Sequence, residues 1–126
     1  MTTIITSEDC GNSPKNTFLQ DLTIAFARSD NAYILDRITH DIRWEIVGAT
    51  HVSGKTDFAA MITQMDASDV AEITVLHVVS HGKAGAVNGT RKFKSGKVEA
   101  FCNVYEFSNA KAERVKEIKS YLIPIK

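Results

Sequence analysis

Histidine is the side chain that titrates nearest neutral pH, so the four histidines of this chain are the first candidates for moving a proton. His51 lies in a predicted loop and His77 in the middle of a predicted strand, and we take both as candidate acid–base residues. The alternatives are a solvated loop histidine at position 51 and, at position 77, a buried histidine paired with a neighbour. His40 lies beside Asp41 at a predicted helix end, where a cap or an ion pair explains it.

Asn103 is the polar residue that most needs a partner. It stands between Phe101 and Tyr105 on one face of a predicted strand that is otherwise apolar. An unpaired amide there would cost about 1–3 kcal/mol. We therefore expect Asn103 to form a hydrogen bond with a ligand carbonyl or hydroxyl, or else with a neighbouring side chain or a trapped water.

The sequence predicts neither a metal site nor a cysteine nucleophile. His77 and His81 would share a strand face but lie about 13 Å apart, which is too far to chelate one ion. Cys102 is predicted to point away from Asn103 and has no adjacent base in the sequence. With Cys10 it makes only two cysteines, too few for a disulfide framework. We expect no metal and no other cofactor.

Composition narrows the class of protein. A chain of 126 residues with 44% hydrophobic content is sufficient for one domain with one core. Its formal net charge is zero, which offers no field to attract phosphate backbones or anionic lipid, so we expect no nucleic-acid and no membrane partner. Residues 1–12 are predicted to be a flexible tail that does not resemble a signal peptide, and residues 13–126 a single domain. The expected location is the cytoplasm.

Helices are predicted first and strands later. Ser13–Pro14 and Ser29–Asn31 are start signals for two helices, the second ending at His40–Asp41, and Thr56 with Asp57 is placed to cap a third. Alternating apolar residues then predict strands, with small residues in the second long strand that permit tight curvature. The predicted strands cover residues 42–47, 71–81, 84–93, 98–107 and 114–123, with Pro124 ending the last.

This order of elements resembles the nuclear transport factor 2-like superfamily and, within it, the SnoaL-like branch of polyketide cyclases and ketosteroid isomerases. The residues that carry the resemblance are Ala25 to Asp30, His40–Asp41, Trp44–Glu45 through Gly48, Gly54 with Phe58, the Gly89 to Gly96 hairpin, Asn103 to Phe107, and Glu117 to Tyr121. The resemblance implies an α+β fold shaped like a cone. A strongly curved mixed or antiparallel sheet would wrap around three N-terminal helices and leave an apolar pocket.

The same resemblance argues against isomerase chemistry. The position of the isomerase base corresponds to Ile46, that of the tyrosine to Leu22, and that of the protonated acid to Asn103. None of these side chains can exchange a proton near neutral pH. A shift of one residue in the register would present Glu45 instead. The epoxide-hydrolase branch needs carboxylates beside an arginine, and Arg91 has none two residues on; we expect it to be solvated with the lysines of its hairpin.

An aromatic lining is predicted for the pocket, because Trp44 shares a strand face with Ile46, which the resemblance places towards the cavity. The expected lining, with plain core packing as the alternative, is Trp44, Phe18, Phe26, Phe58, Met61, Phe101, Tyr105 and Tyr121.

The predicted strand at residues 98–107 is apolar on both faces and must be covered twice, which favours a homodimer through the sheet. The leading functional hypothesis is a protein that binds a small hydrophobic molecule with a ring or a carbonyl. One alternative is a metal-independent cyclase, isomerase or lyase in which His51 or His77 moves a proton and Asn103 orients a carbonyl. The other is a dimeric protein-interaction module whose cavity is filled by side chains.

Overall fold

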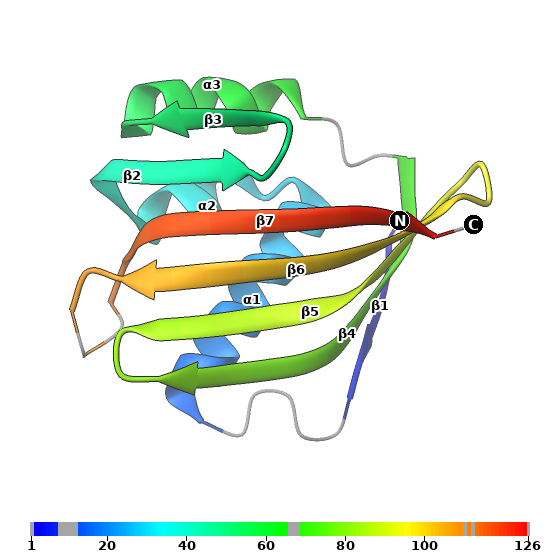
Figure 1. Ribbon diagram of the computed structural model, residues 1–126, viewed down its shortest axis with the longest axis horizontal. Helices are drawn as coiled ribbons and strands as arrows, with labels where there is room; N and C mark the ends of the chain where they lie inside the picture. Colours follow the sequence, from blue (N-terminus) through cyan, green and yellow to red (C-terminus); the bar gives the residue numbers. More distant parts are fainter. Residues whose placement is uncertain (1, 8–12, 66–68, 110, 112, 126) are drawn as a thin grey trace.

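A computed structural model of the chain describes residues 2–7, 13–65, 69–109, 111 and 113–125. Within these residues, three helices lie against one side of a seven-stranded sheet (Figure 1). The elements are β1 (Thr3–Thr6), α1 (Pro14–Arg28), α2 (Asn31–Asp36), β2 (Ile38–Ile46), β3 (Thr50–Ser53), α3 (Lys55–Gln64), β4 (Val70–His81), β5 (Ala84–Phe93), β6 (Val98–Phe107) and β7 (Val115–Ile125).

The sheet has the strand order β1-β4-β5-β6-β7-β2-β3. The β1–β4 and β2–β7 pairs are parallel and the other pairs are antiparallel, so the sheet is mixed. Helix α1 crosses behind β4, β5 and β6, which bend together at one end, while α3 packs on β2 and β3 (Figure 1). The predicted α+β fold, with helices on one side of a curved mixed sheet, is confirmed.

Two of the three predicted helix starts are confirmed. The Ser13 side chain accepts a hydrogen bond from the backbone N–H of Asn16 at 3.1 Å, and the Asp30 side chain accepts one from the backbone N–H of Tyr33 at 3.3 Å. The third is wrong by two residues, because α3 begins at Lys55 and the residue before it, Gly54, has a φ of +89° and no capping side chain.

Helix α2 ends at Asp36, before His40, and the chain enters β2 at Ile38. The sequence analysis extended this helix past Ile38, because Ile38 follows Ile34 at helical spacing. Ile38 instead opens β2, where it lies opposite Val115 of β7, and the register of this pairing shifts between Ile38 and Arg43. The last strand also runs further than predicted, since β7 continues to Ile125.

Residues 3–6 of the predicted tail form a strand. Strand β1 pairs with β4, with Ile4 opposite Ile73, and the Ile4 side chain packs against the core. The apolar pair therefore explains why this segment is ordered against the sheet. Cys10 lies outside the described residues.

A bulge in β4 breaks the alternation read from the sequence. The register with β5 shifts between Val75 and His77, so Val78 is buried while His77 and Val79 are exposed. One extra residue in a strand sends every later side chain to the opposite face.

Glycines on the concave face allow the helix and strands to approach. A Cβ on Gly85 would collide with Leu19 of α1, and one on Gly89 would collide with the carbonyl oxygen of Thr74 on β4. The sequence prediction that small residues in this strand permit close approach is thus supported. Further along β5, Arg91 and Phe93 line a cavity.

Candidate functional site

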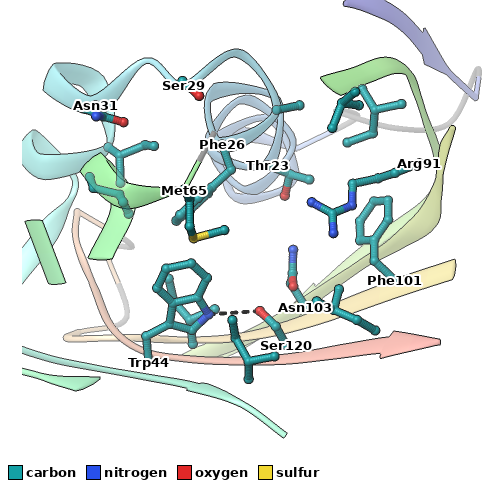
Figure 2. A pocket seen from close by; sticks show the side chains of 18 of the residues that line it. Thr23, Phe26, Ser29, Asn31, Trp44, Met65, Arg91, Phe101, Asn103 and Ser120 are labelled. Carbon is teal, nitrogen blue, oxygen red and sulfur yellow. Dashed lines mark hydrogen bonds between the residues drawn. The ribbon is translucent and has the colours of Figure 1, made fainter. Parts of the chain in front are cut away.

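A cavity of about 270 Å³ lies between α1 and the concave face of the sheet. Its walls come from α1, α2, α3 and from five strands, β2, β4, β5, β6 and β7. Most of the lining side chains are apolar, and a smaller set of polar groups gathers on the side of β5, β6 and β7 (Figure 2). The fold therefore contains a ligand-sized space rather than a fully packed centre.

Trp44 forms a flat wall of this cavity. Its side chain is only 4% exposed, and its indole Nε1 donates to Ser120 Oγ at 3.0 Å (Figure 2). The Phe26 ring lies 5.3 Å from the indole, centroid to centroid, and tilts against it. The hydrogen bond satisfies the one polar atom of the indole, so the ring is held in a fixed orientation.

Four of the seven aromatic residues expected in the lining do line the cavity, namely Trp44, Phe26, Phe101 and Tyr105. Phe58 does not, because it is fully buried behind Trp44, at 5.4 Å between ring centroids. Tyr121 is 40% exposed on the outer face of β7, where it lies opposite Cys102. Its neighbour Ser120 takes the inward position instead, since successive strand residues alternate between faces.

Phe18 and Met61, which we also expected in the lining, pack against the core and do not line the cavity.

A chain of hydrogen bonds anchors the phenol of Tyr105. Thr23 Oγ1 donates to the Leu19 carbonyl at 2.8 Å and lies 2.9 Å from the Tyr105 hydroxyl. Because a threonine hydroxyl has one hydrogen, the tyrosine must be the donor to Thr23. Burial raises the pKa of Tyr105 to about 12, partly offset by its interactions with Thr23 and Asn103. Tyr105 is therefore protonated at neutral pH and is unsuited to act as a base.

Asn103 occupies the centre of the polar side. It lies on the inner face of β6, opposite Ser120 of β7 in the register, and its amide points into the cavity (Figure 2). The position expected from the sequence is the one the structure shows. The amide also interacts with the Tyr105 phenol, so it joins the cavity surface to the buried hydrogen-bond chain.

Arg91 is the charged cavity residue that the sequence analysis missed, and the polar residues Thr23 and Ser120 were missed as well. Arg91 was expected to be solvated, but it lies on the inner face of β5 and its guanidinium reaches into the cavity near Thr23 and Asn103 (Figure 2). It forms an ion pair with Glu99, opposite it on β6, in which Arg91 Nε donates to Glu99 Oε1 at 3.0 Å and Nη2 donates to the same oxygen.

A usable signal for Arg91 was present in the sequence. Gly85 and Gly89 face inward, and counting by twos along the strand from Gly89 reaches Arg91. The neighbouring lysines concealed this pattern, because a run of cations suggests a solvated hairpin.

Neither candidate acid–base histidine reaches the cavity. His51 lies on β3 opposite Glu45 and is exposed, and His77 is on the outer face with Nδ1 3.0 Å from Asn88 Oδ1. The bulge in β4 explains the outward position of His77. Among the described residues, no histidine, aspartate or glutamate lines the cavity, so its polar groups are hydroxyls, amides and one cation.

Two further searches concern metals and membranes. Within the described ranges, no three His, Cys, Asp or Glu side chains come close enough together to hold a metal ion. No described helix combines the length and apolar character needed to cross a membrane.

Comparison with known proteins places the fold. No protein-family model and no curated protein matches the sequence. Solved structures do match. An NTF2-like protein of unknown function from Cytophaga hutchinsonii is 23% identical with a TM-score of 0.71, over 85% of this chain and 97% of that chain. One from Burkholderia xenovorans is 15% identical with a TM-score of 0.75, over 89% and 84%.

A predicted SnoaL-like polyketide cyclase from Shewanella denitrificans is also similar, with 12% identity and a TM-score of 0.71 over 87% of this chain and 91% of that chain. At these identities the similarity is one of fold, and function has to be argued from the site. The chain has the NTF2-like fold that its sequence predicted.

Proposed function

We propose that the protein binds a small, ring-containing hydrophobic molecule that bears a carbonyl group, in the cavity between α1 and the sheet. The single observation that supports this best is the cavity itself, with Trp44 as a flat apolar wall and Asn103, two strands away on the same face of the sheet, as a polar anchor. Its 270 Å³ lies near the lower end of the usual range for ligand pockets, about 300–1,000 Å³, which favours a compact ligand.

Two polar groups of the cavity, on Ser120 and Asn103, each have a hydrogen available to donate to a ligand. Ser120 Oγ already accepts from Trp44, so its own hydroxyl hydrogen is the one left to donate. The Asn103 amide carries two hydrogens, of which the interaction with Tyr105 can use one. A ligand carbonyl, which only accepts, is complementary to such a surface.

Binding accounts for the site with fewer assumptions than turnover does. General acid–base catalysis needs a proton-transfer group within hydrogen-bond reach of the substrate. His51 and His77 lie outside the cavity, and Tyr105 holds its proton tightly. The enzyme hypothesis that uses either histidine therefore loses its acid–base residue, and the interaction-module hypothesis loses the filled cavity on which it was based.

A ligand screen tests the proposal. Trp44 is the only tryptophan in the chain, so its fluorescence reports on the cavity directly. We would screen aromatic, steroid-like and polyketide-like ketones and acids by thermal shift and by fluorescence. A ligand at 100 times its dissociation constant should add about 2.7 kcal/mol, which raises the melting temperature by several degrees.

Asn103→Leu should weaken binding of a carbonyl ligand by about tenfold, the effect of losing a hydrogen bond of roughly 1.4 kcal/mol. Asn88→Leu is the matched control, because Asn88 lies on the outer face of β5 opposite His77. If no compound changes the fluorescence or the melting temperature of the wild type, the binding proposal is wrong.

A further inference from the structure

Arg91 gives the cavity a charge that the apolar walls do not suggest. Among the described residues, it is the one lining side chain that carries a full charge at neutral pH. Its ion-pair partner Glu99 contacts it from the neighbouring strand but does not line the cavity. A ligand in the cavity therefore meets the cation of this pair rather than its anion.

The guanidinium has one edge engaged and one edge available. Glu99 Oε1 accepts from Nε and Nη2, which together form the side edge of the group. The end edge, formed by Nη1 and the second hydrogen of Nη2, points into the cavity towards Asn103 and Thr23 (Figure 2). A planar guanidinium can hold a second carboxylate on this edge with two parallel hydrogen bonds.

We propose that the ligand is a small carboxylic acid, bound as its anion with the carboxylate on the end edge of Arg91 and its ring against Trp44. This inference rests on the proposed binding function and adds the charge of the ligand to it. The Asn103 amide lies beside the same edge of the guanidinium and can donate a hydrogen bond to one of the two carboxylate oxygens of the ligand.

The charge of the site is what favours an acid over a ketone or an amide. A carboxylate removed from water needs a cation and additional donors to offset the lost hydration. Arg91 and Asn103 supply both in one part of the cavity, while most of the remaining lining side chains are apolar. Glu99 limits the gain, because it already neutralises part of the charge of Arg91.

Matched sets of compounds distinguish the ligand classes. Benzoate, cyclohexanecarboxylate and naphthalene-2-carboxylate would each be compared with the corresponding carboxamide and methyl ketone by isothermal titration calorimetry. Each set keeps the ring constant and changes only the polar group. We expect the wild type to bind at least one carboxylate about tenfold more tightly than its amide, since charge-assisted hydrogen bonds are the stronger ones.

Two variants act on the ion pair. In Arg91→Gln/Glu99→Gln both charges are removed, and the ratio of carboxylate to amide affinity should fall to about one. Glu99→Gln alone leaves Arg91 uncompensated and should raise that ratio several-fold. The control is Arg43→Gln/Glu117→Gln, which removes another cross-strand Arg–Glu pair, joined at 2.7 Å outside this cavity, and should leave the ratio unchanged.

The outcomes separate this inference from the proposed function. Ketones or amides that bind as tightly as the carboxylates, with a response of Trp44 fluorescence, would overturn the carboxylate inference and leave the binding function standing. A ratio that persists in Arg91→Gln/Glu99→Gln, or that fails to rise in Glu99→Gln, would also overturn it. Failure of every compound to bind would overturn both. If the double variant does not fold, Glu99→Gln decides.

Discussion

We expect Thr23→Val and Tyr105→Phe to destabilise the protein by unequal and non-additive amounts. Tyr105→Phe removes a buried donor but leaves the Thr23 hydroxyl bonded to the Leu19 carbonyl. The loss is that of one neutral hydrogen bond, about 1 kcal/mol. Thr23→Val instead leaves the tyrosine hydroxyl, on a fully buried side chain, without its acceptor.

The hydroxyl then keeps its interaction with Asn103 but has no acceptor for its own hydrogen, which costs about 1–3 kcal/mol, so Thr23→Val should cost roughly 2 kcal/mol. The double variant removes both partners and should cost less than the sum of the two single changes, with an interaction energy of about 1 kcal/mol. Equilibrium unfolding in urea measures all four free energies, provided that the dependence on urea concentration is the same in each protein.

Thr63→Val is the matched control. Its hydroxyl donates to the Ala59 carbonyl at 2.8 Å, four residues back as in Thr23, but Thr63 is exposed. We expect a change within about 0.5 kcal/mol. The reasoning would be refuted by additive effects of Thr23→Val and Tyr105→Phe, or by a cost of Thr23→Val no greater than that of the control.

Three further predictions concern pH, packing and assembly. Because burial raises the pKa of Tyr105 from 10.0 to about 12, the free energy of unfolding should be highest below pH 10 and fall by about 3 kcal/mol between pH 10 and 12. Tyr105→Phe should lack this loss in alkaline unfolding titrations. Gly89→Ala should cost about 1–3 kcal/mol in urea unfolding, because the new Cβ meets the Thr74 carbonyl and the Phe101 ring; an unchanged midpoint would contradict this. The outer face carries exposed apolar side chains, among them Val104, so we expect a homodimer that Val104→Glu converts to monomer in light scattering. Val47→Glu, at a similarly exposed position just after β2, should leave the dimer intact, and a wild-type monomer at high concentration would exclude the homodimer.

The fold could be predicted because its signals are local. The Ser13 and Asp30 caps, the hairpin at residues 94–96 and the alternation in β6 each depend on neighbours in the chain. The elements that were misplaced depend on distant partners. The irregularity in β2 and the bulge in β4 are set by pairing with β7 and β5, and no residue type at either place announces them.

The candidate site was predictable to the same extent. Trp44 and Asn103 were located because they lie in regular alternating strands. His77 was misplaced by the bulge, and Arg91 was taken for a surface cation because its partner Glu99 is close only across the sheet. A charged residue can be predicted to face inward only when an oppositely charged partner beside it is known, because charged side chains are seldom buried without one.

Strand β1 has a consequence for how copies of this protein can meet. Along the outer edge of β4, β1 pairs with residues 72–75, and the Thr2 hydroxyl donates to the Val70 carbonyl. Further along, the side chain of Asn16 on α1 makes two hydrogen bonds with β4. Its Nδ2 donates to the Val78 carbonyl at 3.2 Å, and its Oδ1 accepts from the Ser80 hydroxyl at 2.7 Å. The edge of β4 is therefore occupied by the chain itself, and the edges that remain for strand addition belong to β1 and β3, which have four residues each. Because such short edges offer few backbone groups, we expect self-association on the broad convex surface, where side chains determine the choice of partner.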